Sequence, residues 1–289
     1  MRGLDAPSAD ARGALHYQVE VELAARLRSA SKEERRAGLY ASIYQERIER
    51  IPMHPLLVRS KDDESRRRAA GVQLRLLSPW LTRDTVFAEI GPGDCALALA
   101  VATRVKTVYA VDVTDVLVPS LPHVDNFHLL QSDGVDVPIL PGTVDLIYSN
   151  QVLEHLHPED AGDHLQAVYA ALAPGGRLVC VTPNRLSGPW DISRQFDPAA
   201  TGLHLREYTT SELSDLLRAS GFSVRLMASY HGRHISPVPE SAIRVFEAGL
   251  EPFPLAVRRP IATCLTAIKV VATKPERPPA PTKSATVPS

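Results

Sequence analysis

The first 80 residues carry apolar side chains at near-helical spacing. Over residues 14–50 this spacing predicts two amphipathic helices. Residues 51–55 contain two prolines, which interrupt a helix because proline has no amide hydrogen to donate. A third helix is predicted over residues 63–78, before Pro79. We therefore expect a helical N-terminal extension over residues 1–80, which covers the pocket of the domain that follows.

Short β-branched and aromatic runs alternate with helical segments from residue 81 to residue 274. This alternation predicts a parallel sheet with helices on both faces, which is the doubly wound α/β architecture. We expect a mostly parallel sheet of seven strands. The predicted strands are 86–90, 107–111, 127–130, 144–148, 177–181, 222–228 and 265–273.

The second half of this domain contains three further features. Residues 187–202 lack a clear period, and this length makes them a candidate lid or substrate loop. Thr209 and Glu212 form a capping box that opens a helix. An insertion at 231–260 separates the last two strands, and the proline-rich residues 275–289 have the composition of a disordered tail.

A glycine-rich turn follows the first predicted strand. Gly91, Pro92 and Gly93 stand at its carboxyl end, where ligands bind in open parallel sheets. Glycines allow a ligand to approach the backbone closely. Asp112 follows the second strand, about twenty residues beyond the turn, and is placed to accept hydrogen bonds from a ribose diol. The pattern predicts a cofactor that contains a nucleoside.

Carboxylates in and near the turn favour a cationic tail on that nucleoside. Glu89 and Asp94 flank the glycines, where they would repel a pyrophosphate and attract an ammonium group. Asp94 alone is also explained as a helix cap. Asp133, with the adjacent Gly134, is placed to accept a hydrogen bond from the adenine amine.

These segments, taken in order, resemble the motif set of class I S-adenosylmethionine-dependent methyltransferases. The resemblance is greatest to the small-molecule branch called methyltransferase type 11, and it covers residues 85–273. One departure is Cys95, which stands where that family commonly has a third glycine. The matching segments are 86–94, 111–112, 133–134, 144–156 and 172–178.

The resemblance implies S-adenosylmethionine as the cofactor. It implies that Glu89 to Gly93 contact the methionine moiety, Asp112 the ribose hydroxyls and Asp133 the adenine amine. The remaining predicted cofactor-binding residues are Val113, Gly134 and Asn150. No proline follows Asn150, and this differs from the amino-group methylases that act on nucleic-acid bases.

Two histidines are the candidate catalytic residues. A base is needed when the methyl acceptor is a hydroxyl, and histidine is the natural base near neutral pH. His155 follows the fourth strand, and the resemblance makes Glu154 and His155 recurrent site-lining residues. His204 comes from the segment expected to fold over the pocket. Ligand spacing typical of a metal site is not apparent, so we expect a metal-independent enzyme.

The aperiodic segment offers groups that recognise a polar acceptor. Trp190 provides an indole for stacking, Asp191 a hydrogen-bond acceptor and Arg194 a cation. These residues are the predicted substrate-binding set. They suggest O-methylation of a hydroxyl on a sugar, a glycoconjugate or a natural product.

Composition and charge narrow the possible partners. The 32 basic and 33 acidic residues give a net charge of −1, which disfavours nucleic acid as a partner. No apolar run is long enough to span a membrane. Three cysteines without a paired motif and an N-terminus unlike a signal peptide indicate a cytoplasmic protein. We expect it to act on a small molecule, and a homodimer is an open option for its assembly.

Two alternatives stay open at this stage. The spacing Gly91-x-Gly93-x-x-Ala96 also fits the dinucleotide fingerprint, which allows an NAD-dependent oxidoreductase. A catalytically silent protein that binds a nucleoside or a partner on the same scaffold is the other. Binding of NAD distinguishes the first, and absence of turnover on any acceptor distinguishes the second.

Overall fold

A computed structural model describes residues 9–51, 54–60, 62–116, 118, 123–230, 233–235, 239–262 and 267–276. Cys264 and residues 277–289, which make up most of the predicted tail, lie outside these ranges. Within the described part, no helix has both the length and the apolar character needed to cross a membrane.

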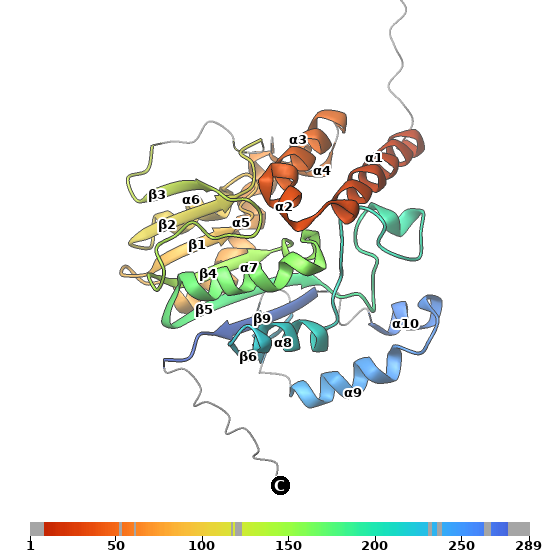
Figure 1. The fold of residues 1–289 in the computed structure, drawn as a ribbon. Helices are drawn as coiled ribbons and strands as arrows, with labels where there is room; N and C mark the ends of the chain where they lie inside the picture. The colour runs from red at the N-terminus through yellow and green to blue at the C-terminus, as the bar shows by residue number, and fades with distance from the viewer. Residues whose placement is uncertain are drawn as a thin grey trace, which may run out of the picture.

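A seven-stranded sheet forms the centre of the molecule (Figure 1). Its strand order is β3-β2-β1-β4-β5-β9-β6. The first five strands in this order are parallel, whereas β9 runs antiparallel to both of its neighbours. The predicted seven-stranded, mostly parallel sheet is confirmed. Its strands are β1 (Val86–Ile90), β2 (Thr107–Asp112), β3 (Phe127–Gln131), β4 (Val144–Asn150), β5 (Leu172–Pro183), β6 (Ser223–Leu226) and β9 (Ala267–Thr273).

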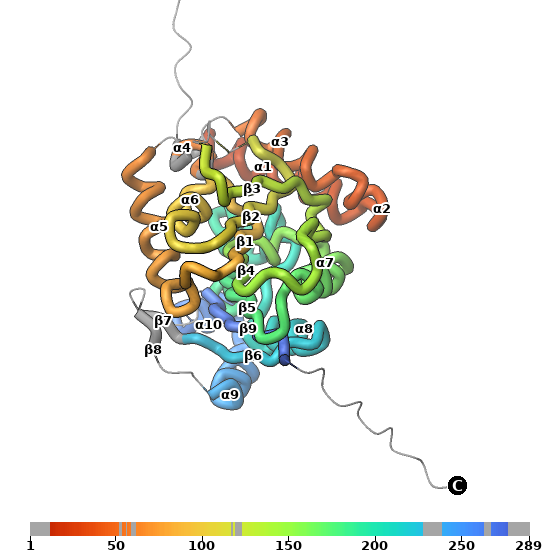
Figure 2. The backbone as a smooth tube through the Cα atoms, turned by 90° about the vertical axis from the view of Figure 1, so that its left-hand side faces the viewer, coloured from red at the N-terminus to blue at the C-terminus, as the bar shows by residue number. Residues whose placement is uncertain are grey.

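Helices cover both faces of the sheet, as Figure 2 shows. Phe87 of β1 packs into the apolar cluster formed with α5 and α6, while the next residue, Ala88, packs into the cluster on the other face with α7 and α8. This alternation is the period of a strand buried on both sides. The helices are α5 (Asp63–Leu77), α6 (Ala96–Ala102), α7 (Pro158–Ala171) and α8 (Thr210–Ala219), and the turn η2 (Ser78–Trp80) follows α5. The capping box predicted at the start of α8 is present.

The N-terminal helices share their apolar core with the sheet. Leu23 and Ile43 are fully buried in the same cluster as Ile90 and Val111 of the sheet. The chain bends at Gly38, between the helical residues 32–34 and 40–50. The φ of Gly38 is 112°, a conformation that glycine adopts readily. The elements are α1 (Ala9–Ser29), α2 (Lys32–Glu34), η1 (Arg35–Leu39), α3 (Tyr40–Arg50) and α4 (Pro55–Ser60). Helix α4 begins at the second proline of a segment that was predicted only as a break.

The segment after β5 packs against α1 (Figure 1). It contains the short helix η4 (Ile192–Gln195). Arg28 of α1 donates hydrogen bonds to the carbonyls of Thr201 and Gly202, at 3.0 and 3.2 Å. The candidate lid is therefore attached to the N-terminal helices in this structure.

The C-terminal insertion is anchored to α8 through one buried carboxylate. Glu247 accepts hydrogen bonds from the backbone amides of Thr210 and Ser211, at 2.7 and 2.9 Å. These amides are the unpaired donors at the start of α8, so Glu247 completes the cap of that helix. The insertion comprises β7 (Ala228–Tyr230), β8 (Arg233–Ile235), α9 (Glu240–Leu250) and α10 (Leu255–Ile261).

A buried ion pair joins the N-terminal helices to α7. Arg35 and Asp160 are 1% and 0% exposed, and Nε and Nη2 of Arg35 donate to Asp160 at 2.6 and 3.2 Å. The hydroxyl of Tyr40 donates to the same carboxylate at 2.7 Å and accepts the amide of His157 at 2.9 Å. This network fixes the start of α3 on α7.

Replacement of Asp160 is expected to destabilise the protein strongly. Asp160→Asn should lower the free energy of unfolding by about 3 kcal/mol, because it leaves the buried guanidinium of Arg35 with only the exposed carboxylate of Glu159 as its counter-charge. Lys32→Ala is the control, since it breaks an exposed ion pair with Asp163 and should cost less than about 1 kcal/mol. Urea denaturation measures both, and equal losses would contradict the role given to the buried pair.

Candidate active site

Two adjoining chambers lie at the carboxyl ends of the strands, beneath the N-terminal helices. The first chamber has a volume of about 160 Å³ and a mainly apolar lining. The second chamber has a volume of about 520 Å³ and a polar lining. The first is lined by Tyr40, Tyr44, Asp112, Val113, Gly134 and His155, among others. The second is lined by His16, Glu20, Glu89, Trp190, Asp191 and His204, among others.

The chambers share part of their lining. Gly91, Gly93, Gln151 and His155 contribute to both, as does Arg47. A ligand that extends from one chamber into the other must pass these residues. Of the predicted cofactor-binding residues, Asp112, Val113 and Gly134 line the first chamber, Glu89, Pro92 and Asn150 the second, and Gly91 and Gly93 both.

Gly91 and Gly134 stand at positions that leave no room for a side chain. A Cβ on Gly91 would lie 2.5 Å from Val152, and a Cβ on Gly134 would lie 2.8 Å from the ring of Tyr40. Both glycines also have positive φ, of 66° and 94°. A larger residue at either position would therefore strain the backbone and push against the chamber wall.

Asp112 stands at the end of β2 with its carboxylate already oriented. Its oxygens accept the amides of Val113 and Gly93 at 2.7 and 3.4 Å. Burial raises the pKa of Asp112 to about 6, although these amide contacts oppose the shift. The carboxylate lines the first chamber and is placed to accept hydrogen bonds from a diol.

Glu89 is a buried carboxylate with an unused oxygen. It is the last residue but one of β1 and is 5% exposed, and its Oε2 has no hydrogen-bond partner among the described residues. Burial raises its pKa well above the ordinary value, and the neighbouring Asp94 and Asp112 add to the shift. A cationic group bound here would satisfy this oxygen. Asp94 instead accepts the amide of Ala96 and pairs with Arg66, so it acts as a helix cap.

Asp133 already has partners within the protein. Its Oδ2 pairs with Nε of Arg36 at 2.7 Å, and its Oδ1 accepts the amides of Val135 and Asp136. Asp133 lines neither chamber, whereas its neighbour Gly134 lines the first. Its carboxylate closes a turn and holds the N-terminal helices, and the adenine contact predicted for it stays a prediction.

Of the predicted substrate-binding residues, Trp190 and Asp191 line the second chamber and Arg194 does not. The indole Nε1 of Trp190 donates to the carbonyl of Asn184 at 3.2 Å, which fixes the ring. The guanidinium of Arg194 lies 4.4 Å from the centre of that ring. It also donates to the carbonyls of its own loop. Arg194 supports Trp190 in this structure, and the substrate contact predicted for it stays a prediction.

His155 lines both chambers and has one free ring nitrogen. Its Nδ1 donates to the carbonyl of Leu203 at 2.8 Å, because a carbonyl can only accept. Burial lowers the pKa of His155 to about 3, and the charges of His204 and Arg47 add to the shift. The ring is therefore neutral at pH 7, with Nε2 available as an acceptor.

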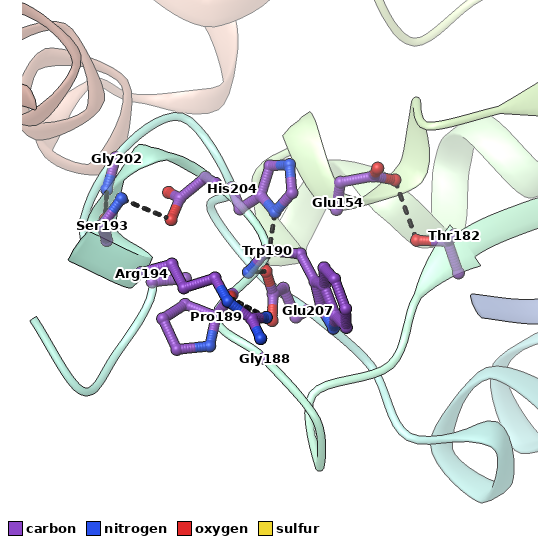
Figure 3. Close-up of polar contacts among 12 residues, drawn as sticks. Glu154, Thr182, Gly188, Pro189, Trp190, Ser193, Arg194, Gly202, His204 and Glu207 are labelled. Atoms are coloured by element: carbon purple, nitrogen blue, oxygen red, sulfur yellow. Dashed lines mark hydrogen bonds and ion pairs between the residues drawn. The ribbon is translucent and has the colours of Figure 1, made fainter. Parts of the chain in front are cut away.

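His204 is held by a carboxylate beneath it. Its Nδ1 donates to Oε1 of Glu207 at 2.7 Å, and the same oxygen accepts the backbone amide of Trp190 at 2.6 Å (Figure 3). Burial alone would lower the pKa of His204, but Glu207, Glu154 and Asp191 raise it above its ordinary value. The ring of His204 lies 4.9 Å from that of His155.

The sequence analysis missed the site residues contributed by the N-terminal helices. Tyr40, Tyr44 and Arg47 of α3 line the first chamber, and His16 and Glu20 of α1 line the second. Spacings of three or four residues place each set on one helix face. One signal in the sequence could have indicated these site residues. Polar side chains recur on a helix face that would be apolar if it only packed against the core.

Comparisons with known proteins agree with this geometry. A family model described as a methyltransferase domain matches residues 63–226, more than half of the chain. A probable S-adenosylmethionine-dependent methyltransferase of Mycolicibacterium smegmatis is 30% identical over 171 residues, which cover 57% of this chain and 62% of that protein. The chain thus spans less than two thirds of that relative.

Two further proteins are similar over longer stretches. A probable S-adenosylmethionine-dependent methyltransferase of Mycobacterium tuberculosis is 28% identical over 214 residues, which cover 70% of this chain and 74% of that protein. The crystal structure of the YcgJ protein from Bacillus subtilis has a TM-score of 0.50 at 18% identity, and the match covers 73% of this chain and all of that one. This last similarity shows a shared fold. With the family model matching more than half of its length, the chain belongs to the class I S-adenosylmethionine-dependent methyltransferases.

Proposed function

We propose that this protein transfers a methyl group from S-adenosylmethionine to a hydroxyl of a small polar acceptor, such as a sugar, a glycoconjugate or a natural product. The observation that carries the proposal is the pair of adjoining chambers, one mainly apolar and one polar, that share the glycine turn and His155. The first chamber suits an adenosine, and the second suits a hydroxylated molecule.

The residues around the first chamber fit S-adenosylmethionine. Asp112 has the position and the charge to accept the ribose hydroxyls, and the ring of Tyr40 against Gly134 provides an apolar wall for the adenine. The unpartnered oxygen of Glu89 suits the ammonium of the methionine moiety. When bound, the cofactor supplies an activated methyl group on a sulfonium.

The second chamber supports a polar acceptor. Trp190 offers an indole face for stacking on a sugar or an aromatic ring, and Asp191 has a buried Oδ2 without a partner among the described residues. His155 and His204 face the same space and are the proposed catalytic residues. They would bind the acceptor hydroxyl and promote loss of its proton, which a hydroxyl nucleophile requires.

The alternatives are less well supported. An NAD-dependent oxidoreductase requires a pyrophosphate site, and the buried Glu89, whose Oε2 has no partner among the described residues, offers a pyrophosphate no positive charge. A catalytically silent relative would keep the first chamber without needing an ordered second one.

The buried Cys95 and Cys180 are free thiols, which supports the expected cytoplasmic location as part of the proposal.

Calorimetric titration tests the cofactor assignment. Separate titrations of the purified protein with S-adenosylmethionine, S-adenosylhomocysteine and NAD should show one site per chain for the two adenosyl compounds and no binding of NAD. Binding of NAD alone would contradict the proposal and restore the oxidoreductase alternative.

The affinity for S-adenosylmethionine should depend on pH through Asp112. Its pKa of about 6 means that the carboxylate is ionised at pH 8 and increasingly protonated as the pH falls to 5. A carboxylate accepts hydroxyl hydrogen bonds better than a carboxylic acid, so the affinity should fall with decreasing pH. Asp112→Asn should weaken binding at pH 8 by roughly 10- to 100-fold and reduce this pH dependence. An unchanged pH profile in this variant would contradict the role of Asp112.

The two tryptophans provide a matched test of the second chamber. Methyl transfer from labelled S-adenosylmethionine can be screened against sugars, glycosides and phenols. With an acceptor in hand, Trp190→Ala should lower kcat/KM by about tenfold or more while leaving the affinity for S-adenosylmethionine unchanged. Trp80→Phe, in η2 and outside both linings, is the control and should retain activity. Full activity of the Trp190 variant would refute this acceptor site.

A further inference from the structure

A cluster of three potential metal ligands lies at the wall of the second chamber. Glu154 and His155 belong to the turn η3 (Leu153–His155), and His204 comes from the segment before α8. One carboxylate oxygen and one nitrogen of each imidazole all lie within 4.8 Å of one another. We propose that these residues bind a divalent transition-metal cation of the zinc class, which holds the acceptor's hydroxyl oxygen; this role for the acceptor rests on the function proposed above.

Both imidazoles are oriented as metal ligands are in proteins. His155 donates from Nδ1 to the carbonyl of Leu203, and His204 donates from Nδ1 to Glu207. Nε2 is therefore the nitrogen that each ring can offer a cation when the ring is neutral. A ligating histidine almost always gives its other nitrogen to a carbonyl or a carboxylate, which fixes the tautomer and the ring.

Glu154 has one fixed oxygen and one oxygen without a partner. The side chain is fully buried, and its Oε2 accepts the hydroxyl of Thr182 at 2.8 Å (Figure 3). Its Oε1 has no hydrogen-bond partner among the described residues. Burial of a carboxylate oxygen without a partner is costly, and a cation at this position would remove that cost.

The surrounding charges favour a cation. Glu207 and Asp191 add two carboxylates near His204. The arginines on the lining of the second chamber are Arg47 and Arg66, and each is already paired with another carboxylate, on Glu20 and Asp94 respectively. Glu154, Asp191 and Glu207 therefore make the local field negative.

The ligand types select the class of metal. Two imidazoles and one carboxylate suit Zn²⁺, Co²⁺ or Fe²⁺, whereas Mg²⁺ and Ca²⁺ prefer oxygen ligands alone. Zinc lies about 2.0–2.2 Å from such ligands, so the three ligand atoms would close on the ion by about an ångström. Three protein ligands leave a fourth position for another molecule. His155 and His204 line the second chamber, so this position opens toward the acceptor.

A second cluster in the same chamber does not have these properties. The ligand atoms of His16, Glu20 and His54 also lie within 4.8 Å of one another. Glu20, however, already accepts Nε of Arg47 at 2.8 Å and His16 at 2.9 Å on one oxygen, and its other oxygen accepts the amide of Leu203 at 3.4 Å. The guanidinium of Arg47 already supplies the positive charge that a metal ion would bring to Glu20. We therefore use this cluster as the comparison site in the test of the proposal.

The proposed site replaces the expectation of a metal-independent enzyme. A hydroxyl bound to a divalent cation loses its proton more readily because the cation stabilises the oxyanion. The proton would leave to solvent through the second chamber, and the oxygen would keep the electron pair that forms the new O–CH3 bond as the S–CH3 bond of the cofactor breaks. His155 and His204 then act as ligands of the cation in place of accepting that proton themselves.

Titration of chelator-treated protein with Co²⁺ tests the site without any enzymatic assay. The wild-type chain should bind one Co²⁺, with the visible absorption bands of a site with nitrogen ligands, and a large excess of Mg²⁺ should not displace it. Glu154→Gln and His204→Ala should each weaken binding by at least about 100-fold, and Glu207→Gln by about tenfold through the ring that it holds.

His16→Gln is the matched control, because it alters the comparison cluster in the same chamber. It should leave the affinity for Co²⁺ unchanged. Circular dichroism of each variant separates lost binding from lost folding. If Glu154→Gln and His204→Ala fail to fold, Glu207→Gln still tests the site, because it keeps all three proposed ligands. The proposal is overturned if the wild-type chain binds no stoichiometric Co²⁺, or if His16→Gln abolishes binding while Glu154→Gln preserves it.

Calorimetry on the same chelator-treated protein separates this inference from the proposed function. A protein that binds S-adenosylmethionine but takes up no added Co²⁺ would overturn the metal site and leave the proposed cofactor in place. Binding of Co²⁺ without S-adenosylmethionine would support the metal site and contradict the proposed function. Undiminished methyl transfer by metal-free protein would overturn the role given to the cation.

Discussion

The buried ion pair between Arg35 and Asp160 determines how the site is covered. It connects the N-terminal helices to α7, and the same carboxylate accepts the hydroxyl of Tyr40. Tyr40 lies against Gly134 and forms part of the first chamber. The interaction that stabilises the attachment of these helices therefore also shapes the space in which we place the adenine. Stability and ligand binding depend on one set of contacts here.

The parallel sheet supplies the other half of the site. Its strands end side by side, so Glu89 of β1 and Asp112 of β2 lie near each other although about twenty residues separate them. Burial raises the pKa of both carboxyl groups, and each gains from a ligand that satisfies it. A ligand with hydroxyls at one position and an ammonium at the other matches this pair. The electrostatics thus favour a nucleoside with an amino-acid tail.

The sequence predicted the sheet, and which residues stand at the ends of its strands, for a physical reason. Strand period, glycine turns and strand-end carboxylates are local features, and a parallel sheet brings them to one edge. The fold class and the positions of Glu89, Gly91 and Asp112 at the chambers could therefore be read from the sequence. Their roles in binding stay predictions.

Contacts between distant segments could not be read in the same way. Asp133 is paired with Arg36 across 97 positions, and no local pattern predicts which cation will reach a strand-end carboxylate. The guanidinium of Arg194 lies against the ring of Trp190. Both residues belong to one aperiodic loop, and no sequence pattern predicts the path of such a loop. Glu154 and His204 meet only when the segment after β5 folds over η3. For this reason, no residue spacing in the sequence indicated the potential metal site.

A crystal structure of the protein with S-adenosylhomocysteine tests the central claim most directly. The account predicts the adenine beside Tyr40 and Gly134, the ribose hydroxyls on Asp112 and the amino group on Glu89, with the sulfur directed toward the second chamber. A ligand bound elsewhere, or an amino group that makes no contact with Glu89, would contradict the account.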